Sequence, residues 1–207
     1  MKKYKSPVMM KKGRYSEYFL TLPEETKSKI LSKMDGHTKK LCEYCDKGNY
    51  SHMCNIVSCL AIYETLQEEG MSKEDALRVI NDEMHKFVEK HSAPTYRKMF
   101  AKKGMLKFMG RILPWAFSKG SGVGWRYVWH RDASTDYYLQ FECHECIYAK
   151  IFKSLGTPEL GPAFCYCDDI NYGSIPGIKF TRNHTLCRDG QVCDFKFEKQ
   201  KPEEKKA

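Results

Sequence analysis

The spacing of apolar positions predicts helices in the first half of the chain. Over residues 56–66 the apolar side chains recur at every third or fourth position, and Gly70 ends the run. Ser72 is then a suitable N-cap for a second apolar face within residues 76–88, which Pro94 ends. Two consecutive helices with so short a connection predict an antiparallel αα-hairpin.

Two further helices are expected on either side of this hairpin. Pro23 is a typical first residue for a helix over residues 24–34, and the polar segment 36–50 then predicts turns. A stripe of Met and Phe within residues 95–117 predicts a later helix that breaks at Pro114. Such a stripe is typical of a packed core.

Beyond residue 124 the apolar period changes from helical spacing to two, which predicts strands. Aromatic and polar residues alternate over residues 125–130 and 137–141, on either side of a polar turn at residues 132–135. This pattern predicts a β-hairpin. Its first, aromatic strand has two interpretations: an interface in a homo-oligomer, or the wall of a pocket.

A helix and a second hairpin are expected to complete the fold. Residues 143–154 return to helical spacing, and Gly156 ends them. Strand-like runs over residues 178–186 and 192–197 flank an Asp-Gly turn at 189–190. The fold class is therefore α+β, with N-terminal helices (an αα-hairpin) packed on a C-terminal antiparallel sheet that has one inserted helix.

Length and composition predict one folded domain with two looser ends. A chain of 207 residues is long enough to bury a core, which we assign to residues 23–198. Residues 1–22 are expected to be a flexible basic arm, and residues 199–207 a disordered tail. The GSGVG segment at 120–124 follows no strand, so we interpret it as a flexible connector and not as a phosphate loop.

The net charge of +9 narrows the expected partners. Basic residues near the N-terminus and over residues 97–107 predict attraction of small anions, and no nucleic-acid-binding motif is present. No apolar run approaches the ~18 residues that span a bilayer. The basic N-terminus also lacks the apolar part of a signal peptide. We therefore expect a cytoplasmic protein with a small anionic substrate and neither a membrane nor a nucleic acid as partner.

Ten cysteines without a secretion signal favour reduced thiols, a metal site or catalysis over disulfides. Cys143 and Cys146 form a C-x-x-C pair at the expected start of a helix. Such a pair holds a metal, forms a redox couple or lowers a thiol pKa. The expected cofactor is none or a bound zinc or iron, with Cys143, Cys146, Cys165 and Cys167 as candidate ligands.

A second C-x-x-C pair, Cys42 and Cys45, lies in the polar segment. Together with Cys54, Cys59 and His52 it has the residue types of a zinc knuckle, but the spacing is irregular. We therefore favour a structural interpretation of these cysteines.

The densest cluster of reactive side chains is the Cys-Tyr-Cys-Asp-Asp run at residues 165–169. A thiolate of Cys165 would act as a nucleophile, and Asp168 would orient a base or a water molecule. The cluster precedes a loop rich in Gly and Pro, where reactive groups are often presented. Adjacent acids are also common helix caps and turn formers, which is the alternative interpretation.

A cation and an imidazole follow on the next expected strand. Arg182 and His184 are two positions apart, so both side chains should lie on one face. Arg182, with Thr181 beside it, would bind a carboxylate through two hydrogen bonds, and His184 would transfer a proton near neutral pH. The hairpin turn would then bring Cys193 opposite residues 184–187, at the same site.

Several of these motifs resemble the L-2-amino-thiazoline-4-carboxylic acid hydrolase family. The run LGTPEL is followed by C-x-x-D from Cys165, by F-T-R-x-H-T-L from Phe180 and by G-x-x-C-D-F from Gly190. The segment LAIYETLQEEGMSKEDAL is similar to that family's helical hairpin, and FECHECIYAKIFKSLG to its Cys-bearing helix. The match of that cysteine is Cys146, which we expect to contact substrate.

The resemblance implies a hydrolase that opens the ring of 2-amino-thiazoline-4-carboxylate to N-carbamoyl-cysteine. That reaction needs a nucleophile at ring carbon C2, a proton for the departing sulfur and an anchor for the carboxylate. We expect Arg182 as the anchor and His184 with Asp168 as the acid/base pair. Two mechanisms remain open: Cys165 attacks C2 covalently, or Cys165 and Cys193 hold a metal that activates water.

A function from another class also fits these features. Helices followed by a sheet with scattered cysteines would suit a non-catalytic, metal- or thiol-based sensor that binds a small molecule. Rapid labelling of one or two thiols in the folded protein would argue against a purely structural role for all ten cysteines.

Overall fold

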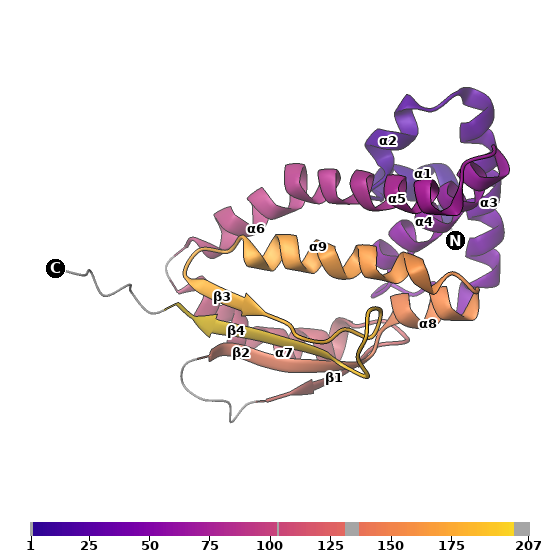
Figure 1. Ribbon diagram of the computed structural model, residues 1–207. Helices are drawn as coiled ribbons and strands as arrows, with labels where there is room; N and C mark the ends of the chain where they lie inside the picture. Colours follow the sequence, from indigo (N-terminus) through magenta and orange to yellow (C-terminus); the bar gives the residue numbers. More distant parts are fainter. Residues whose placement is uncertain (1, 103, 131–136, 201–207) are drawn as a thin grey trace.

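The computed structural model describes residues 2–102, 104–130 and 137–200 of the 207-residue chain. Within them, helices precede a four-stranded antiparallel sheet, and two more helices, α8 and α9, lie between its second and third strands in sequence (Figure 1). The helical segments are η1 (Lys2–Tyr4), α1 (Ser6–Lys12), α2 (Ser16–Thr21), α3 (Glu24–Lys40), η2 (Cys42–Tyr44), α4 (Tyr50–Glu68), α5 (Lys73–Phe87), η3 (Val88–Ser92), α6 (Ala93–Phe100), α7 (Met105–Gly120), α8 (Ile147–Ser154), η4 (Pro158–Leu160) and α9 (Gly161–Gly173). The strands are β1 (Arg126–Trp129), β2 (Tyr137–Glu145), β3 (Ile178–Thr181) and β4 (Cys193–Lys199).

The α+β class predicted from the sequence is confirmed, but the N-terminal segment is not a flexible arm. Helices α1 and α2 occupy most of it, and Met9, Met10 and Tyr15 are fully buried or nearly so. The Tyr15 hydroxyl donates a 3.2 Å hydrogen bond to the carbonyl oxygen of Ile80 in α5. The abundant lysines of this segment conceal an apolar face, since the buried methionines are flanked by exposed basic residues.

The predicted αα-hairpin is confirmed as α4 and α5. Ser72 caps α5, with its hydroxyl accepting a 3.0 Å hydrogen bond from the backbone N–H of Asp75. The helix expected after Pro23 is also present as α3, but it continues past Gly36 to Lys40. Packing explains the extension, because α3 lies along α4 and buries His37 beyond the expected end at Met34.

Pro94 does not end the helical run after α5. The backbone passes through a π-helical turn at residues 88–92, and Pro94 then lies in the first turn of α6. At that position proline needs no backbone N–H donor, so it starts a helix instead of ending one. The wider π turn connects α5 to α6 without ending the helical run.

The expected break at Pro114 is likewise wrong. Pro114 lies buried inside α7, and the break falls earlier, at Gly104, whose φ of 80° is left-handed. Such a φ favours glycine, so the interruption between α6 and α7 follows from the backbone geometry at Gly104. The GSGVG segment leaves α7 and forms the connection to β1, as predicted.

The strand order is β1-β2-β4-β3, with every neighbouring pair antiparallel. Both predicted hairpin pairings are therefore present. The second is not a tight hairpin, because β3 ends at Thr181 and β4 begins only at Cys193. Residues 182–192 form a long connection, and turns within it are closed by hydrogen bonds to the Thr185 carbonyl.

Two helices, not one, are inserted before β3. Cys143 belongs to strand β2 and Cys146 is the N-cap of α8, so this C-x-x-C pair spans a strand end and not the first turn of a helix. The segment with Cys165 and Asp168 forms α9, which the sequence pattern did not identify as a helix. Pro162 in its first turn is consistent with a helix start.

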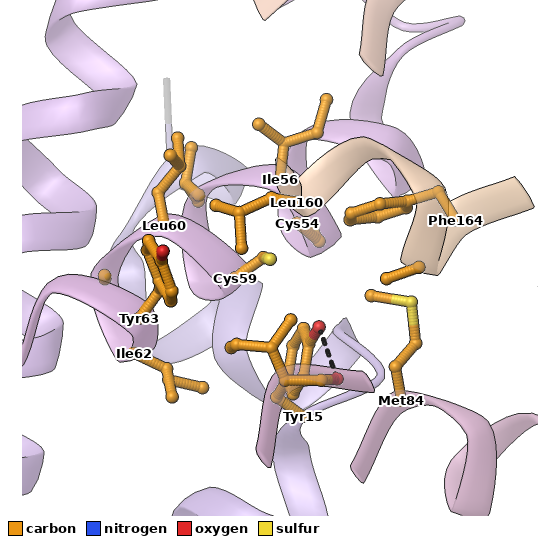
Figure 2. Packing of buried hydrophobic residues seen from close by; sticks show 14 of the residues in the cluster. Tyr15, Cys54, Ile56, Cys59, Leu60, Ile62, Tyr63, Met84, Leu160 and Phe164 are labelled. Atoms are coloured by element: carbon orange, nitrogen blue, oxygen red, sulfur yellow. Dashed lines mark hydrogen bonds between the residues drawn. The ribbon is translucent and has the colours of Figure 1, made fainter. Parts of the chain in front are cut away.

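Buried side chains form two clusters. One fills the space among the N-terminal helices, α8 and α9. Figure 2 shows Cys59 of α4 in this cluster together with Tyr15 and Phe164. The other lies between the sheet and helices α6, α7 and α9, where alternate residues of β4 are buried. Helix α9 contributes to both clusters and therefore joins the helical part to the sheet.

Two sequence predictions fall wholly or partly outside the described residues. The polar turn at 132–135 is one, and residues 201–207 of the expected tail are the other. The start of that expected tail is ordered, since Lys199 ends β4 and the Gln200 N–H donates to the Gly177 carbonyl at 3.2 Å. In the described ranges, no helix combines the length and apolar character needed to cross a membrane.

We expect replacement of Met9 by alanine to lower the free energy of unfolding by about 2–5 kcal/mol, because it leaves a cavity in the core. The neighbouring Val8 is 41% exposed, so Val8→Ala should change it by only about 0.5 kcal/mol. Chemical denaturation of both variants measures the difference. Equal stabilities would show that the N-terminal helices do not pack as described.

Candidate active site

One face of α9 lines a cavity. Phe164, Cys165, Asp168, Asn171 and Tyr172 all contribute to its wall. Their spacing of one, four, seven and eight residues from the first places them along a single helical face. The chain therefore presents a thiol, a carboxyl and an amide on one wall of the same cavity.

The sheet forms the opposite wall. Tyr127 of β1 pairs with Cys143 of β2, which pairs in turn with Cys193 of β4. All three line the cavity, with the stacked rings of Phe141 and Phe195 beside them. Because side chains alternate across a strand, these residues share the face that is turned towards α9.

The cavity has a volume of about 280 Å³ and extends beyond the sheet and α9. Arg14 from the N-terminal segment, His52 of α4 and Tyr148 of α8 also line it, as does Trp125. A predominantly aromatic pocket with a few polar groups is typical of a small-molecule site. The aromatic strand β1 thus serves as a pocket wall, one of the two interpretations of its sequence.

Arg182 connects the end of β3 to α9 through its guanidinium. Its Nη1 donates to Asp168 at 3.0 Å, and its Nη2 donates to Asp169 and to the Cys165 carbonyl, each at 2.7 Å. Only 1% of the side chain is exposed. The Arg188 guanidinium also donates to Asp169, at 2.5 Å, and lies over the Tyr166 ring. The acidic pair is therefore held by two arginines.

Cys165 lines the cavity and has a lowered pKa. A hydrogen bond from the Cys187 thiol lowers the pKa of Cys165, and Thr185 and the Arg182 charge lower it further, against the effect of burial. Its contacts with Cys146 and Cys165 raise the pKa of Cys187, so Cys187 keeps its proton. A thiolate is thus favoured at Cys165.

Three other thiols in or beside the cavity wall have raised pKa values. Burial raises the pKa of Cys167 and of Cys193 to about 12 in each case, and that of Cys143 is raised too. Cys193 accepts a hydrogen bond from the Leu186 N–H at 3.2 Å, so it does lie across from residues 184–187 as predicted. Its environment suits packing better than nucleophilic attack.

The pKa of Asp168 is shifted in the opposite direction from that of Cys165. Burial raises the pKa of its carboxyl, although the charges of Arg182 and Arg14 act against this. About a third of its side-chain surface is accessible, which leaves it open to the cavity. A raised pKa brings a carboxyl closer to the range in which it can both give and accept a proton.

His52 and Tyr148 form a polar pair that sequence reasoning did not assign to this site. The His52 Nδ1 lies 2.7 Å from the Tyr148 hydroxyl, and the imidazole packs on Trp125. Burial lowers the pKa of His52 to about 4, with help from the Arg14 charge, so the ring is neutral at pH 7. The sequence had suggested His52 only as a weak zinc candidate, because its distance from the Cys165 cluster along the chain concealed the contact.

His184 does not lie with Arg182. Strand β3 ends at Thr181, so the two-residue spacing that predicted a shared face no longer applies. The His184 side chain is 59% exposed, and its Nδ1 is 3.7 Å from Asp189. Thr181 lies in the β3–β4 pairing opposite Lys196. Neither residue lines the cavity, whereas Cys146 and Cys193 both do.

The described residues contain no group of three or more His, Cys, Asp or Glu arranged to hold a metal ion. Cys143 donates to the Glu145 carbonyl at 3.0 Å, and Cys167 donates to the Ala163 carbonyl at 3.3 Å. In the other C-x-x-C segment, Cys45 contacts carbonyls of α3 and its end, and Cys54 and Cys59 are buried in α4. Cys45, Cys143 and Cys167 thus each contact a backbone carbonyl, whereas Cys146 and Cys165 line the same cavity.

A family model for L-2-amino-thiazoline-4-carboxylic acid hydrolase matches residues 40–197 of the 207. The chain belongs to this hydrolase family. No curated protein and no solved structure matched it.

The part of this hydrolase chain that matches the family contains both walls of the cavity, α9 and the sheet. It also contains His52, Tyr148 and Arg182. Arg14 lies outside the matched residues, although it lines the same cavity. Cys165, Asp168, Arg182 and Cys193 of the family motifs therefore line one cavity, whereas Arg14 comes from outside the matched residues.

Gly161, at the start of α9, allows Cys187 to approach the hydrolase site. A Cβ at this position would lie 2.8 Å from the Cys187 sulfur, closer than van der Waals contact allows. Gly161→Ala should therefore destabilise the protein by about 1–3 kcal/mol. At Gly173, in the same helix, a Cβ meets nothing within 4 Å. Gly173→Ala should stabilise by up to about 1 kcal/mol. Thermal denaturation that ranks the two in the reverse order would contradict this packing.

The thiols of this hydrolase should differ in alkylation by iodoacetamide. Because its pKa is lowered, Cys165 should react with a midpoint below the ~8.5 of an ordinary cysteine. Cys167, buried and with a raised pKa, should react slowly across the same range. Peptide mapping by mass spectrometry follows both in one sample, with exposed Cys42 as the accessible reference. Equal rates for Cys165 and Cys167 at neutral pH would contradict the assignment.

Proposed function

We propose that the protein hydrolyses a small cyclic substrate such as 2-amino-thiazoline-4-carboxylate, and that Cys165 is its nucleophile. The observation that supports this most is the pairing of two groups on one face of α9 within one cavity. One is a thiol whose pKa is lowered, and the other is a carboxyl, Asp168, whose pKa is raised. The family to which the chain belongs bears the name of this reaction.

In the first step the Cys165 thiolate attacks ring carbon C2. A bond forms between the Cys165 sulfur and C2, and the bond from C2 to the ring sulfur breaks. The protonated Asp168 carboxyl gives its proton to the departing sulfur, which becomes the thiol of the product. The covalent intermediate is an isothiourea on Cys165, and Asp168 is left as a carboxylate.

In the second step water adds to C2 and releases the product. One water proton goes to Asp168 and the other to the former ring nitrogen. The bond between C2 and Cys165 breaks, which regenerates the thiolate and yields N-carbamoyl-cysteine. The step returns every group to its starting state without an oxidant or a metal. Arg182 keeps Asp168 in position for both transfers through its 3.0 Å hydrogen bond.

The neutral His52–Tyr148 pair supports the second step. Its imidazole lines the same cavity as Cys165, and the 2.7 Å contact with Tyr148 fixes the ring orientation. A ring held neutral has a free acceptor or donor nitrogen, which would orient the attacking water or the substrate's exocyclic nitrogen. His184 has no part in this scheme, because its side chain is exposed.

The proposal is tested with purified protein and 2-amino-thiazoline-4-carboxylate. Cys165→Ser should lower kcat by at least about 10³-fold while the thermal midpoint stays close to that of the wild type. His184→Ala, which changes an exposed residue that the sequence analysis had favoured, should retain turnover. Mass spectrometry should detect the covalent adduct on Cys165 during turnover. Unchanged activity in the serine variant would overturn the role of Cys165.

A further inference from the structure

Arg14 reaches the cavity because its backbone is fixed on both sides. The Arg14 N–H donates a 2.8 Å hydrogen bond to Asn55 Oδ1 in α4. The preceding Gly13 lies close to α4, where a Cβ would come within 3.3 Å of the Cys54 carbonyl oxygen, and the following Tyr15 is fully buried. The residue therefore has little freedom, and its side chain enters the cavity wall.

The Arg14 guanidinium has no carboxylate partner among the residues that the structure describes. Cys167 lies close enough to raise the Arg14 pKa. Asp168 is near enough to favour the Arg14 charge, but its described hydrogen bond comes from Arg182. An arginine stays protonated in proteins, and an enclosed cation without an anion is unfavourable. The Arg14 guanidinium therefore stays available to a negatively charged ligand in the cavity, beyond the stabilisation that Asp168 already gives its charge.

Arg182 also lines the cavity, and its buried Nε has no hydrogen-bond partner in the described part of the chain, but its two terminal nitrogens are occupied. Both of its terminal nitrogens donate to protein oxygens, namely those of Asp168, Asp169 and the Cys165 carbonyl. Binding a substrate carboxylate there would require breaking these contacts. Arg182 is thus a positioning residue for Asp168, and the sequence-based assignment of the carboxylate anchor to it fits the geometry poorly.

Asn171 provides a second unsatisfied polar group. It is only 3% exposed, it lines the cavity, and its Oδ1 has no hydrogen-bond partner in the described part of the chain. Buried polar atoms normally have partners, and an orphaned acceptor in a pocket calls for a donor from a ligand or a water. The cavity thus has a cation, Arg14, that can bind an anion, and an acceptor, Asn171 Oδ1, that can bind an N–H group.

We propose that Arg14 and Asn171 together recognise the ligand, Arg14 by binding its carboxylate and Asn171 by accepting a hydrogen bond from its nitrogen. The ligand class is a small carboxylate with an amino or imino group. The inference rests on the proposed function for the identity of the molecule hydrolysed, but the binding itself is independent of turnover. Arg14, outside the family match, would then be a specificity residue contributed by the N-terminal helices.

The test measures binding in the Cys165→Ser background, where ligand is not consumed. Two probes are compared by calorimetry: 2-amino-thiazoline-4-carboxylate and its carboxamide, which lacks the negative charge. The charged probe should bind about 10- to 100-fold more tightly, as expected for hydrogen bonds between charged groups. Arg14→Gln should reduce that ratio to near one and leave carboxamide binding within about twofold.

Three further variants separate recognition from effects on folding or overall charge. Arg97 is exposed on α6, so Arg97→Gln makes the same change in net charge and should preserve the ratio. Arg14→Lys retains the charge without the planar fork and should give an intermediate ratio, which is decisive if Arg14→Gln is unstable. Asn171→Leu should weaken both probes about equally, by about threefold to tenfold, and should leave the ratio unchanged.

The outcomes distinguish this inference from the proposed function. If the preference for the carboxylate depends on Arg14 but the wild type shows no turnover, the inference is supported and the proposed reaction is contradicted. Turnover by the wild type with equal binding of both probes would overturn the inference and leave the reaction standing. An unchanged ratio in Arg14→Gln would also overturn it.

Discussion

The buried charge network of Arg182 is the interaction on which the rest of the site depends. Arg182 follows β3 directly, whereas Asp168, Asp169 and the Cys165 carbonyl all belong to α9. One guanidinium therefore fixes the helix wall of the cavity to the sheet wall. Removing one partner of a buried pair typically costs about 3–5 kcal/mol, because the remaining charge is left uncompensated. The network holds the geometry in which the thiol and the carboxyl share one face.

The helical half of the molecule is more than a support for the sheet. Helix α4 contributes His52 to the cavity wall and holds the Arg14 backbone through Asn55. The buried Tyr15 ties the same segment to α5 through the Ile80 carbonyl. Because α9 packs against α5 as well as against the sheet, a change in the N-terminal core would be transmitted directly to Cys165 and Asp168. The contacts that pack α9 against α5 and the sheet thus also position Cys165 and Asp168.

Sequence patterns correctly predicted the features of the fold that depend on interactions between residues close together in the chain. The Ser72 cap, the Gly70 stop and the alternating aromatics of β1 depend on neighbours within a few residues, and each was read from the sequence. The π turn before α6 and the burial of Pro114 depend on tertiary packing, so a rule based on proline alone gave the wrong boundaries. The α+β class followed because the change of period near residue 124 is a property of the whole chain.

In the candidate site, too, residues close together in the chain were predicted correctly, whereas contacts between distant segments were not. Cys165 and Asp168 were identified from their residue types and spacing, and both line the cavity. The expectation for His184 assumed that β3 continued past Thr181, and the long connection after it turns the imidazole towards solvent. Arg14 and His52 lie more than a hundred residues before Cys165 and in segments with other plausible roles. Only the three-dimensional fold brings them to the thiol.

The pKa of Cys165 is lowered and that of Asp168 is raised, although both groups line the same cavity. Burial by itself would not shift them in opposite directions. Burial alone raises the pKa of both a thiol and a carboxyl. Asp168 follows that rule, since burial outweighs its arginines. Cys165 departs from it because Cys187, pressed against Gly161, donates a hydrogen bond to its sulfur. The environment thereby raises the pKa of the carboxyl and lowers that of the thiol, and these are the directions that a general acid and a neighbouring nucleophile require. These opposite shifts depend on a close contact between a glycine in α9 and a cysteine in the β3–β4 connection, so the chemistry of the site follows from its packing.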